Sequence, residues 1–367
     1  MCAYDPKVKI FRRSLWSIPI LAMLIASCSA AASSVPEASH PTGIFEISPR
    51  FDYAGTFVNG LALVSSGKGW GYIDKTGKYA IAPNFSVALD FVDGLAAAGT
   101  SASTLWGYID KTGKFVISPQ FVTTGNFFEG LAMARNNAAY GFIDRSGKWA
   151  IAPRFNEAGN FSGGFAAVKI GSKYGFVDKR GKYLVRPKFN RVGTFADGLA
   201  AVMAKSKWGF IDTKGKYVID PQFAFVSAGD NSGEFLGGFA DGLAAVWQSR
   251  TNWGYIGKTG NFVIKGRRGH GGDFVNGLAV MRDGKSSAFI NKKGNYVIRT
   301  HYKYAMPFVN GFARVGNETK WGYIDKTGKT LVAPQFDAAG DFVDGLAAVE
   351  IGTKWGYISS AHVLRHS

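Results

Sequence analysis

One unit of about 34 residues recurs along most of this 367-residue chain, and it restricts the possible folds more than any other feature. The anchor of successive copies stands at Trp70, Trp106, Tyr140, Tyr174, Trp208, Trp253, Ala288, Trp321 and Trp355. The intervals are 33 to 36 residues, apart from one of 45 that indicates an insertion near residues 226–236. A unit this short cannot bury an aromatic face alone, so neighbouring units must stack to form a core.

Each unit has the composition of short β-strands joined by tight turns. In one copy, Trp70–Ile73 and residues 79–81 have strand composition and flank the segment Asp74–Lys78. The Asp side chain can accept hydrogen bonds from N–H groups two residues on, and the glycine suits the left-handed position of a hairpin turn. Pro83 has no N–H to donate, so we expect strand pairing to end there.

A second recurrent feature of the unit is a Phe followed three residues later by Gly, as at residues 91–94. This segment leads into a third strand, such as residues 199–203 in another copy. The 48 glycines fit many tight turns, and the 29 phenylalanines fit β-sheet. We therefore expect an all-β protein with little helix: a tandem array of about nine β-hairpin or meander units. The first copy, from residue 42, lacks its beginning, and the last lacks its end near residue 358. Both an open β-solenoid and a closed propeller-like ring are consistent with an array whose first and last copies are incomplete.

The motif Trp-Gly-Tyr-Ile-Asp-Lys-Thr-Gly-Lys at residues 70–78, with Pro-x-Phe and Phe-x-Asp-Gly-Leu-Ala, resembles the bacterial WG-repeat family. The resemblance extends over residues 42–358, and Tyr140, Tyr174 and Ala288 depart from the anchor Trp. It implies a repeat architecture and brings no catalytic residues with it.

The N-terminal segment is typical of a bacterial lipoprotein leader. Basic residues 7–13 precede a mostly apolar run over residues 14–27, the layout of a secretory signal peptide. Leu24-Ile25-Ala26-Ser27-Cys28 resembles a lipobox, in which the Cys thiol is acylated and becomes the new N-terminus. We expect a signal peptide over residues 1–27, a lipidated Cys and flexible tether over 28–41, the array over 42–358 and a C-terminal tail over 359–367. Ser29 favours sorting to the outer membrane, so we expect an exported protein that is lipid-anchored in the cell envelope.

The charge of the chain favours anionic partners. The net charge is +17, and removal of residues 1–27, with four cations and one carboxylate, leaves +14. A basic exported protein would be drawn to an anionic surface polymer or an envelope protein, whereas nucleic acid is disfavoured. The alternative is that the turn lysines are merely solvated. Whether the protein is a monomer or an oligomer stays open.

No catalytic constellation is evident in the sequence. It contains no Gly-x-Ser-x-Gly, P-loop or His-Glu-x-x-His motif, and its cysteines, Cys2 and Cys28, precede the array. The recurring aspartates at 74, 110, 144, 178, 212 and 325 are accompanied by lysines, which suits turns better than calcium sites. We expect no catalytic residue, metal or cofactor.

These observations favour a non-enzymatic, membrane-anchored repeat protein that presents a binding surface to a protein or an anionic partner. The alternative is a carbohydrate- or peptidoglycan-binding module in which exposed Trp or Tyr side chains stack on sugar rings, although a residue present in every unit is more often core. A hydrolase on a propeller-like scaffold is the least favoured class.

The clearest local departure lies in two adjacent units. Seven units carry the proline of Pro-x-Phe, whereas residues 266–268 read Gly-Arg-Arg and residues 300–302 read Thr-His-Tyr. Arginine suits carboxylate or phosphate recognition, and histidine adds pH sensitivity. If the array has a discrete ligand site, we expect it around Arg267, Arg268, His270 and His301; unconstrained drift is the alternative explanation.

We predict that residues 1–27 are removed and that Cys28 becomes the acylated N-terminus, because its context matches the lipobox. Mass spectrometry of the membrane-associated protein should show a chain that begins at Cys28 and carries acyl mass. A mature chain that begins elsewhere without acyl groups would rule out this processing.

Overall fold

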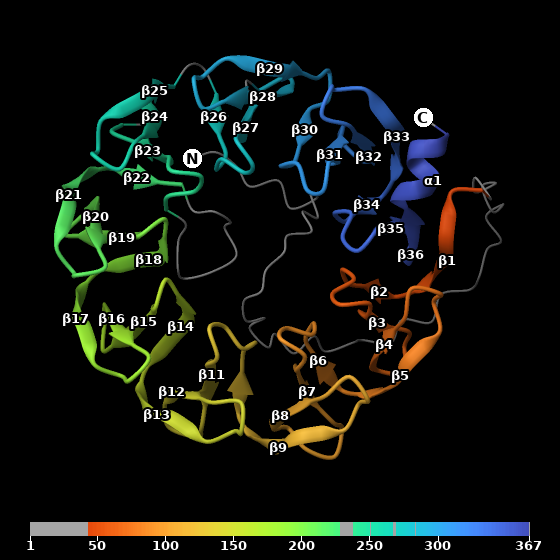
Figure 1. Cartoon of the computed structure of the whole chain (residues 1–367), viewed down its shortest axis with the longest axis horizontal. Coiled ribbons are helices and arrows are strands. Elements are labelled where there is room, and N and C mark those ends of the chain that lie inside the picture. Colours follow the sequence, from red (N-terminus) through yellow and green to blue (C-terminus); the bar gives the residue numbers. More distant parts are fainter. Residues whose placement is uncertain (1–42, 228–237, 250, 267–268, 283, 367) are drawn as a thin grey trace, which may run out of the picture.

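The computed structural model describes residues 43–227, 238–249, 251–266, 269–282 and 284–366. In these residues, nine four-stranded antiparallel sheets follow one another around a central axis, as Figure 1 shows. The protein is a nine-bladed β-propeller, and the expectation of an all-β array with about nine units is confirmed. We number the blades from the N-terminus, so that blade 1 is β2–β5 and blade 9 is β34, β35, β36 and β1.

The two strands of each blade nearest the axis begin the unit. The inner strands are β2 (Tyr53–Ala54), β6 (Val87–Ala88), β10 (Thr123–Thr124), β14 (Glu157–Ser162), β18 (Arg191–Ala196), β22 (Phe225–Val226), β26 (His270–Gly271), β30 (Tyr304–Ala305) and β34 (Ala338–Ala339). The second strands are β3 (Ala62–Ser65), β7 (Ala96–Gly99), β11 (Ala132–Arg135), β15 (Phe165–Ile170), β19 (Leu199–Ala204), β23 (Ala244–Trp247), β27 (Leu278–Arg282), β31 (Ala313–Gly316) and β35 (Leu346–Ile351).

The other two strands contain the Trp-Gly segment and the perimeter of the ring. The third strands are β4 (Trp70–Ile73), β8 (Trp106–Ile109), β12 (Tyr140–Ile143), β16 (Lys173–Asp178), β20 (Lys207–Asp212), β24 (Trp253–Ile256), β28 (Ser287–Asn291), β32 (Trp321–Ile324) and β36 (Lys354–Ser359). The outer strands are β5 (Tyr79–Phe85), β9 (Phe115–Phe121), β13 (Trp149–Phe155), β17 (Tyr183–Phe189), β21 (Tyr217–Phe223), β25 (Phe262–Lys265), β29 (Tyr296–Arg299), β33 (Thr330–Phe336) and β1 (Phe45–Phe51).

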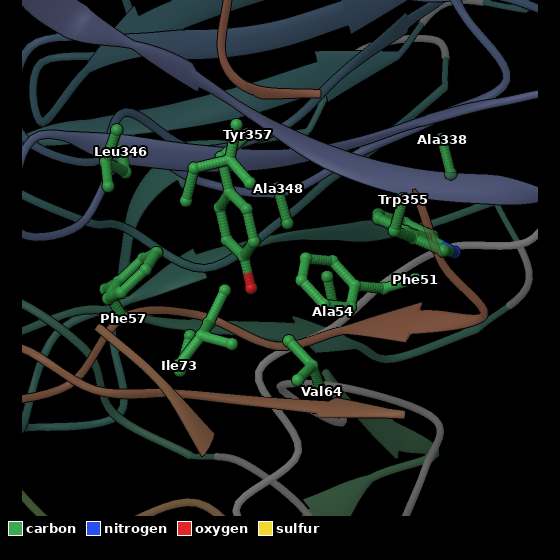
Figure 2. Packing of buried hydrophobic residues seen from close by; sticks show 12 residues of the cluster. Phe51, Ala54, Phe57, Val64, Ile73, Ala338, Leu346, Ala348, Trp355 and Tyr357 are labelled. Atoms are coloured by element: carbon green, nitrogen blue, oxygen red, sulfur yellow. The ribbon is translucent and has the colours of Figure 1, made fainter. Parts of the chain in front are cut away.

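The two ends of the array complete one blade together. β1, from the start of the array, pairs with β36, from its end, with Phe45 opposite Ile358 and Phe51 opposite Trp355. Their side chains join those of blade 1 in one hydrophobic cluster, in which the Phe57 and Tyr357 rings lie side by side (Figure 2). The two partial copies of the sequence are therefore one split blade, and the ring is closed.

The core consists of nine hydrophobic clusters, one at each interface between consecutive blades. Side chains alternate between the two faces of a strand, so each blade contributes to two clusters. On β4, for example, Tyr72 packs toward blade 2, whereas Ile73 packs toward blade 9. Alanines such as Ala96 and Ala98 in the second strands allow the sheets to approach closely.

The same aromatic contact joins all nine pairs of neighbouring blades. A Tyr or Phe on the third strand of one blade meets the Phe of the Phe-x-x-Gly segment in the next blade, with ring centroids 4.7–5.0 Å apart. The pairs are Tyr72–Phe91, Tyr108–Phe127, Phe142–Phe161, Phe176–Phe195, Phe210–Phe239, Tyr255–Phe274, Phe289–Phe308, Tyr323–Phe342 and Tyr357–Phe57. Each tyrosine hydroxyl also donates to a backbone carbonyl of the next blade, as from Tyr72 to Leu89 O at 2.7 Å.

The expectation that Pro83 ends strand pairing is wrong. β5 runs through Pro83 to Phe85, with a register shift between the pairs Trp70–Phe85 and Tyr72–Ile81. Proline is tolerated there because β5 is the outer strand and no further strand needs its N–H. The glycine after Trp70 permits this shift: a Cβ on Gly71 would lie 2.7 Å from Ile81 O and 2.8 Å from the nitrogen of Pro83.

Blade 7 departs from this arrangement. Its strand pairing shows that the sequence alignment of this unit must be moved by one residue. Ser287 lies opposite Arg282 as Trp70 lies opposite Ser65, so Ser287 occupies the Trp position and Ala288 the Gly position. Ala288 carries a Cβ, and the four-residue strand β29 pairs with β28 without the register shift that accompanies Pro-x-Phe in the seven blades that carry it. Tyr302 takes the place of the phenylalanine and is buried, so this blade keeps its aromatic core despite losing Pro-x-Phe.

A short helix follows the ring. α1 (Ser360–Arg365) lies in the segment expected to be a tail, and its Val363 is buried in the cluster between blades 8 and 9. Within the described residues, α1 is the only α-helix, and no helix there is long and apolar enough to cross a bilayer.

We predict that Phe127→Ala lowers the free energy of unfolding by about 3–5 kcal/mol, because it removes one buried ring from the contact between blades 2 and 3. Urea denaturation measures the change. The control is Val116→Ala at an exposed position of β9, which should change the free energy of unfolding by less than about 0.5 kcal/mol. Similar effects of the two substitutions would contradict a structural role for the aromatic contact.

Candidate functional site

The recurring aspartates are engaged inside their own turns. Oδ1 of Asp74 accepts hydrogen bonds from the Thr76 hydroxyl at 2.6 Å, the Thr76 N–H at 2.9 Å and the Lys78 N–H at 3.1 Å. Gly77 has a φ of 85°, as the turn requires. Among the described residues, no group of three or more His, Cys, Asp or Glu side chains is arranged to hold a metal ion. The expectation that Asp74–Lys78 forms a tight turn is confirmed.

The Lys or Arg directly after the turn aspartate position, the first cation of the turn, joins neighbouring blades. Lys75 Nζ donates to the carbonyl oxygen of Asp344 in blade 9 at 2.7 Å, and Lys258 Nζ donates to that of Asp197 in blade 5 at 2.6 Å. The Asp197 carboxylate in turn accepts the N–H of Gly242 in blade 6 at 2.6 Å. Part of the positive charge of the turns is therefore structural and is not free to bind a partner.

The tryptophans of the Trp-Gly series belong mainly to the core. Trp208, Trp253, Trp321 and Trp355 are buried, and Trp70 and Trp106 are half-buried. A flat platform for sugar rings needs exposed indole faces, and this series does not form one. The interpretation of the series as core residues is confirmed.

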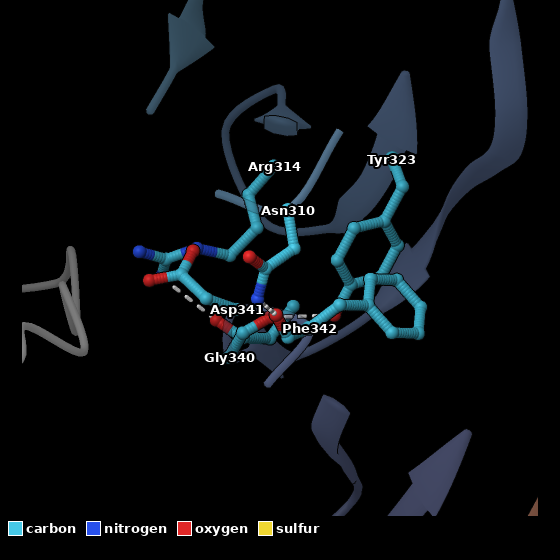
Figure 3. Close-up of polar contacts among 7 residues, drawn as sticks. Asn310, Arg314, Tyr323, Gly340, Asp341 and Phe342 are labelled. Atoms are coloured by element: carbon cyan, nitrogen blue, oxygen red, sulfur yellow. Dashed lines mark hydrogen bonds and ion pairs between the residues drawn. The ribbon is translucent and has the colours of Figure 1, made fainter. Parts of the chain in front are cut away.

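A buried ion pair crosses the interface between blades 8 and 9. Arg314 Nε lies 2.8 Å from Asp341 Oδ1, and its Nη1 donates to Ala339 O at 2.9 Å (Figure 3). Beside it, Asn310 Nδ2 donates to Phe342 O, and the Tyr323 hydroxyl donates to Gly340 O. Burial raises the pKa of Tyr323 above its ordinary value of 10.0, so this hydroxyl remains a donor at neutral pH. The network ties two blades together.

The two histidines of the ligand site expected from the sequence do not lie together. Arg267 and Arg268 lie outside the described residues. His270 is on the inner strand β26, whereas His301 follows the outer strand β29 of the same sheet, and its ring centroid lies 4.0 Å from that of Tyr302. Two further strands, β27 and β28, separate β26 from β29. Partial burial and the Arg282 guanidinium lower the pKa of His270 below its ordinary value of 6.5.

The strongest concentration of positive charge lies on blades 3 and 4. Residues 144–191 contain eleven Lys and Arg against three Asp and Glu, so they contribute +8 of the net charge of +17. Asp144 and Asp178 accept hydrogen bonds within their turns, and Glu157 pairs with Lys169. Each carboxylate of this sector therefore already has a partner, and that of Asp178 accepts the N–H of Lys182 at 2.9 Å.

A groove opens in this sector between the outer strands β13 and β17. We call it the rim groove; it is lined by Arg154, Gly181, Lys182, Tyr183, Leu184 and Arg186 and has a volume of about 490 Å³. The Arg154 guanidinium donates to Gly181 O at 2.5 Å and lies 5.8 Å from the Tyr183 ring centroid. The Arg186 guanidinium lies 5.4 Å from the same centroid. Among the described carboxylates, none forms an ion pair with Arg154, Lys182 or Arg186.

The sequence contained a signal for this groove that motif analysis missed. Arg154 is the middle residue of a Pro-x-Phe segment, and Arg186 precedes the proline of the next one. At the position of Arg186, blade 5 carries Asp220 and blade 3 carries Ala152. The repeat therefore does not require a cation there, and a count of charge per unit would have singled out blade 4.

Comparison with known proteins agrees with the repeat and the fold. The family model of the WG containing repeat matches residues 42–69, 70–98, 106–138, 140–174, 174–208, 208–231, 253–285, 288–320 and 321–355. No curated protein matches the chain in sequence.

Solved structures resemble this chain at low sequence identity. A eukaryotic initiation factor is 13% identical, with a TM-score of 0.55, over 78% of this chain and 88% of that one. BamB from Moraxella catarrhalis is 11% identical, with a TM-score of 0.44, over 86% of this chain and 99% of that one. At such identity the likeness to the initiation factor shows the fold alone.

We predict that the protein loses stability as the pH falls below about 4, because the turn hydrogen bonds favour the charged carboxylates. Hydrogen bonds from Thr76, Thr112 and Ser146 lower the pKa values of Asp74, Asp110 and Asp144. The unfolded value is about 3.9, so this stabilisation is complete above it and disappears as the pH falls through the lower folded values.

Urea midpoints measured between about pH 5 and pH 2.5 test this prediction, for which a turn carboxamide is the matched control. Asn291 already occupies the aspartate position in blade 7 and accepts the N–H groups of Lys293 and Asn295. The variant with Asp74, Asp110 and Asp144 all changed to Asn should show a weaker acid dependence. An acid dependence equal to that of the wild type would refute the role given to these carboxylates.

Proposed function

The chain belongs to the WG-containing repeat family, and from that premise we propose that it is a non-enzymatic binding scaffold of the bacterial cell envelope. In this proposal the closed ring is a rigid support, and its surface binds an anionic partner, either a surface polymer or an acidic envelope protein. The Cys28 anchor and the tether over residues 29–41 hold the ring near a membrane, which we propose to be the outer membrane.

The observation that carries this proposal is that recurrent and variable residues have different roles. The recurrent aromatic side chains form the contacts between blades, the recurrent aspartates close turns, and the first turn cations join neighbouring blades. Blades also differ in their surface residues, and the largest difference in charge is the cationic sector of blades 3 and 4. A surface of this kind attracts and orients anionic partners.

Envelope placement is supported by the leader sequence. A basic segment, an apolar run and a lipobox precede the array in the order that export and lipidation require. An exported, anchored ring with a net charge of +14 would meet the acidic polymers and proteins of the envelope before it met any nucleic acid.

We predict that the full chain captures a specific acidic component from envelope extracts and that raising the salt concentration from about 50 mM to about 500 mM releases it, because salt screens surface charges. The captured material should be identified by mass spectrometry and carbohydrate analysis. A globular control protein with a similar isoelectric point of about 9.7 separates specific capture from general attraction to charge. Capture that ignores salt, or no enrichment over the control, would contradict the proposal.

A further inference from the structure

We propose that the rim groove binds an acidic polysaccharide, a flexible sugar chain with repeated carboxylate groups. This inference rests on the proposed function as a binding scaffold and names the chemical class of its partner. It places recognition on Arg154, Lys182 and Arg186, and it gives Tyr183 and Leu184 the apolar part of the contact.

The guanidinium groups provide the charge recognition. Arg154 and Arg186 come from the outer strands of consecutive blades, and both lie over the Tyr183 ring, which restricts their orientation. Arg154 uses one N–H on Gly181 O and keeps others for a ligand. A guanidinium can bond both oxygens of a carboxylate at once, and the exposed Lys182 adds a further positive charge.

The apolar lining favours a sugar chain over bare phosphate. Tyr183 and Leu184 are half-buried and lie between the cations of the groove. A pyranose ring presents C–H groups that such a surface can cover, whereas an inorganic polyphosphate has none. The alternation of charge and apolar surface therefore matches a polymer in which each residue carries both a carboxylate and a ring.

The position of the groove favours a flexible chain over a duplex or a flat membrane. β13 and β17 lie on the convex perimeter of the ring (Figure 1). A DNA duplex is stiff over about 150 base pairs and would touch a convex perimeter at few phosphates.

Further cations extend the site along the perimeter. Arg180 in the turn of blade 4 and Lys188 on β17 are both exposed. On the next blade, Asp220 stands where Arg186 stands in blade 4, so the positive strip weakens there. A short run of several sugar residues, rather than a single monosaccharide, fits a strip of this kind.

Titration calorimetry of the full chain with polygalacturonate oligomers tests the assignment. The groove variant is Arg154→Ala with Arg186→Ala, and the matched control is Lys78→Ala with Lys114→Ala, which removes two exposed cations that directly precede the outer strands of blades 1 and 2. We expect the groove variant to weaken binding at least tenfold and the control less than threefold. Arg154→Lys with Arg186→Lys, which keeps the charge and loses the planar fork, should weaken binding at least threefold.

Other anionic probes test whether the groove recognises carboxylates on a sugar chain or negative charge in general. Methyl-esterified polygalacturonate should not bind, and single-stranded DNA, polyphosphate and phosphatidylglycerol vesicles should bind more weakly and without dependence on the groove. Equal losses in the groove and control variants, or groove-dependent binding of one of these other probes in preference to polygalacturonate, would overturn the inference while leaving a binding scaffold. If the wild-type chain binds none of the anionic probes and captures no acidic envelope component, the proposed function itself fails. Unfolding curves that match the wild type establish that each variant is folded.

Discussion

The contact between one aromatic ring on the third strand of a blade and one phenylalanine of the next blade is the interaction on which the rest of this structure depends. Every blade carries both rings of this contact. A blade that has paired one ring with one neighbour therefore still presents its other ring on the opposite face. An open array would leave an unmatched ring at each end, at a cost of about 1.5–3 kcal/mol for a Phe left in water. The Tyr357–Phe57 contact, together with the pairing of β1 and β36, removes both ends.

The remaining recurrent residues serve this stacking. Gly71 lets the outer strand approach the third strand at the position where a Cβ would collide with its backbone. The Asp74 turn directs the chain into that outer strand, and Lys75 then reaches the preceding blade. In blade 7, Ala288 stands in place of glycine and Pro-x-Phe is absent, yet Tyr302 still fills the core.

Because packing uses the repeated residues, function is left to the positions where repeats differ. Net charge alone overstates the cations that a partner can reach, since several turn lysines and arginines bond to neighbouring blades. Arg186 is different: Ala152 and Asp220 occupy its position in the adjacent blades, so the fold does not require its charge. A cation that the repeat does not require, beside Arg154 and Tyr183, is the kind of residue a binding surface needs.

The sequence by itself determined the β units, their number and the use of aspartate in the turns, because a 34-residue period and the segment Asp74–Lys78 depend only on residues near one another in the chain. Tertiary structure alone decided the rest. Pro83 lies within a strand because β5 is an edge, and edges exist only once blades are assembled. His270 and His301 are close in a repeat alignment but lie at opposite edges of one sheet. Ring closure and the rim groove both join residues of different blades, and local pattern carries no information about which blades meet, because the packing of whole sheets sets those distances.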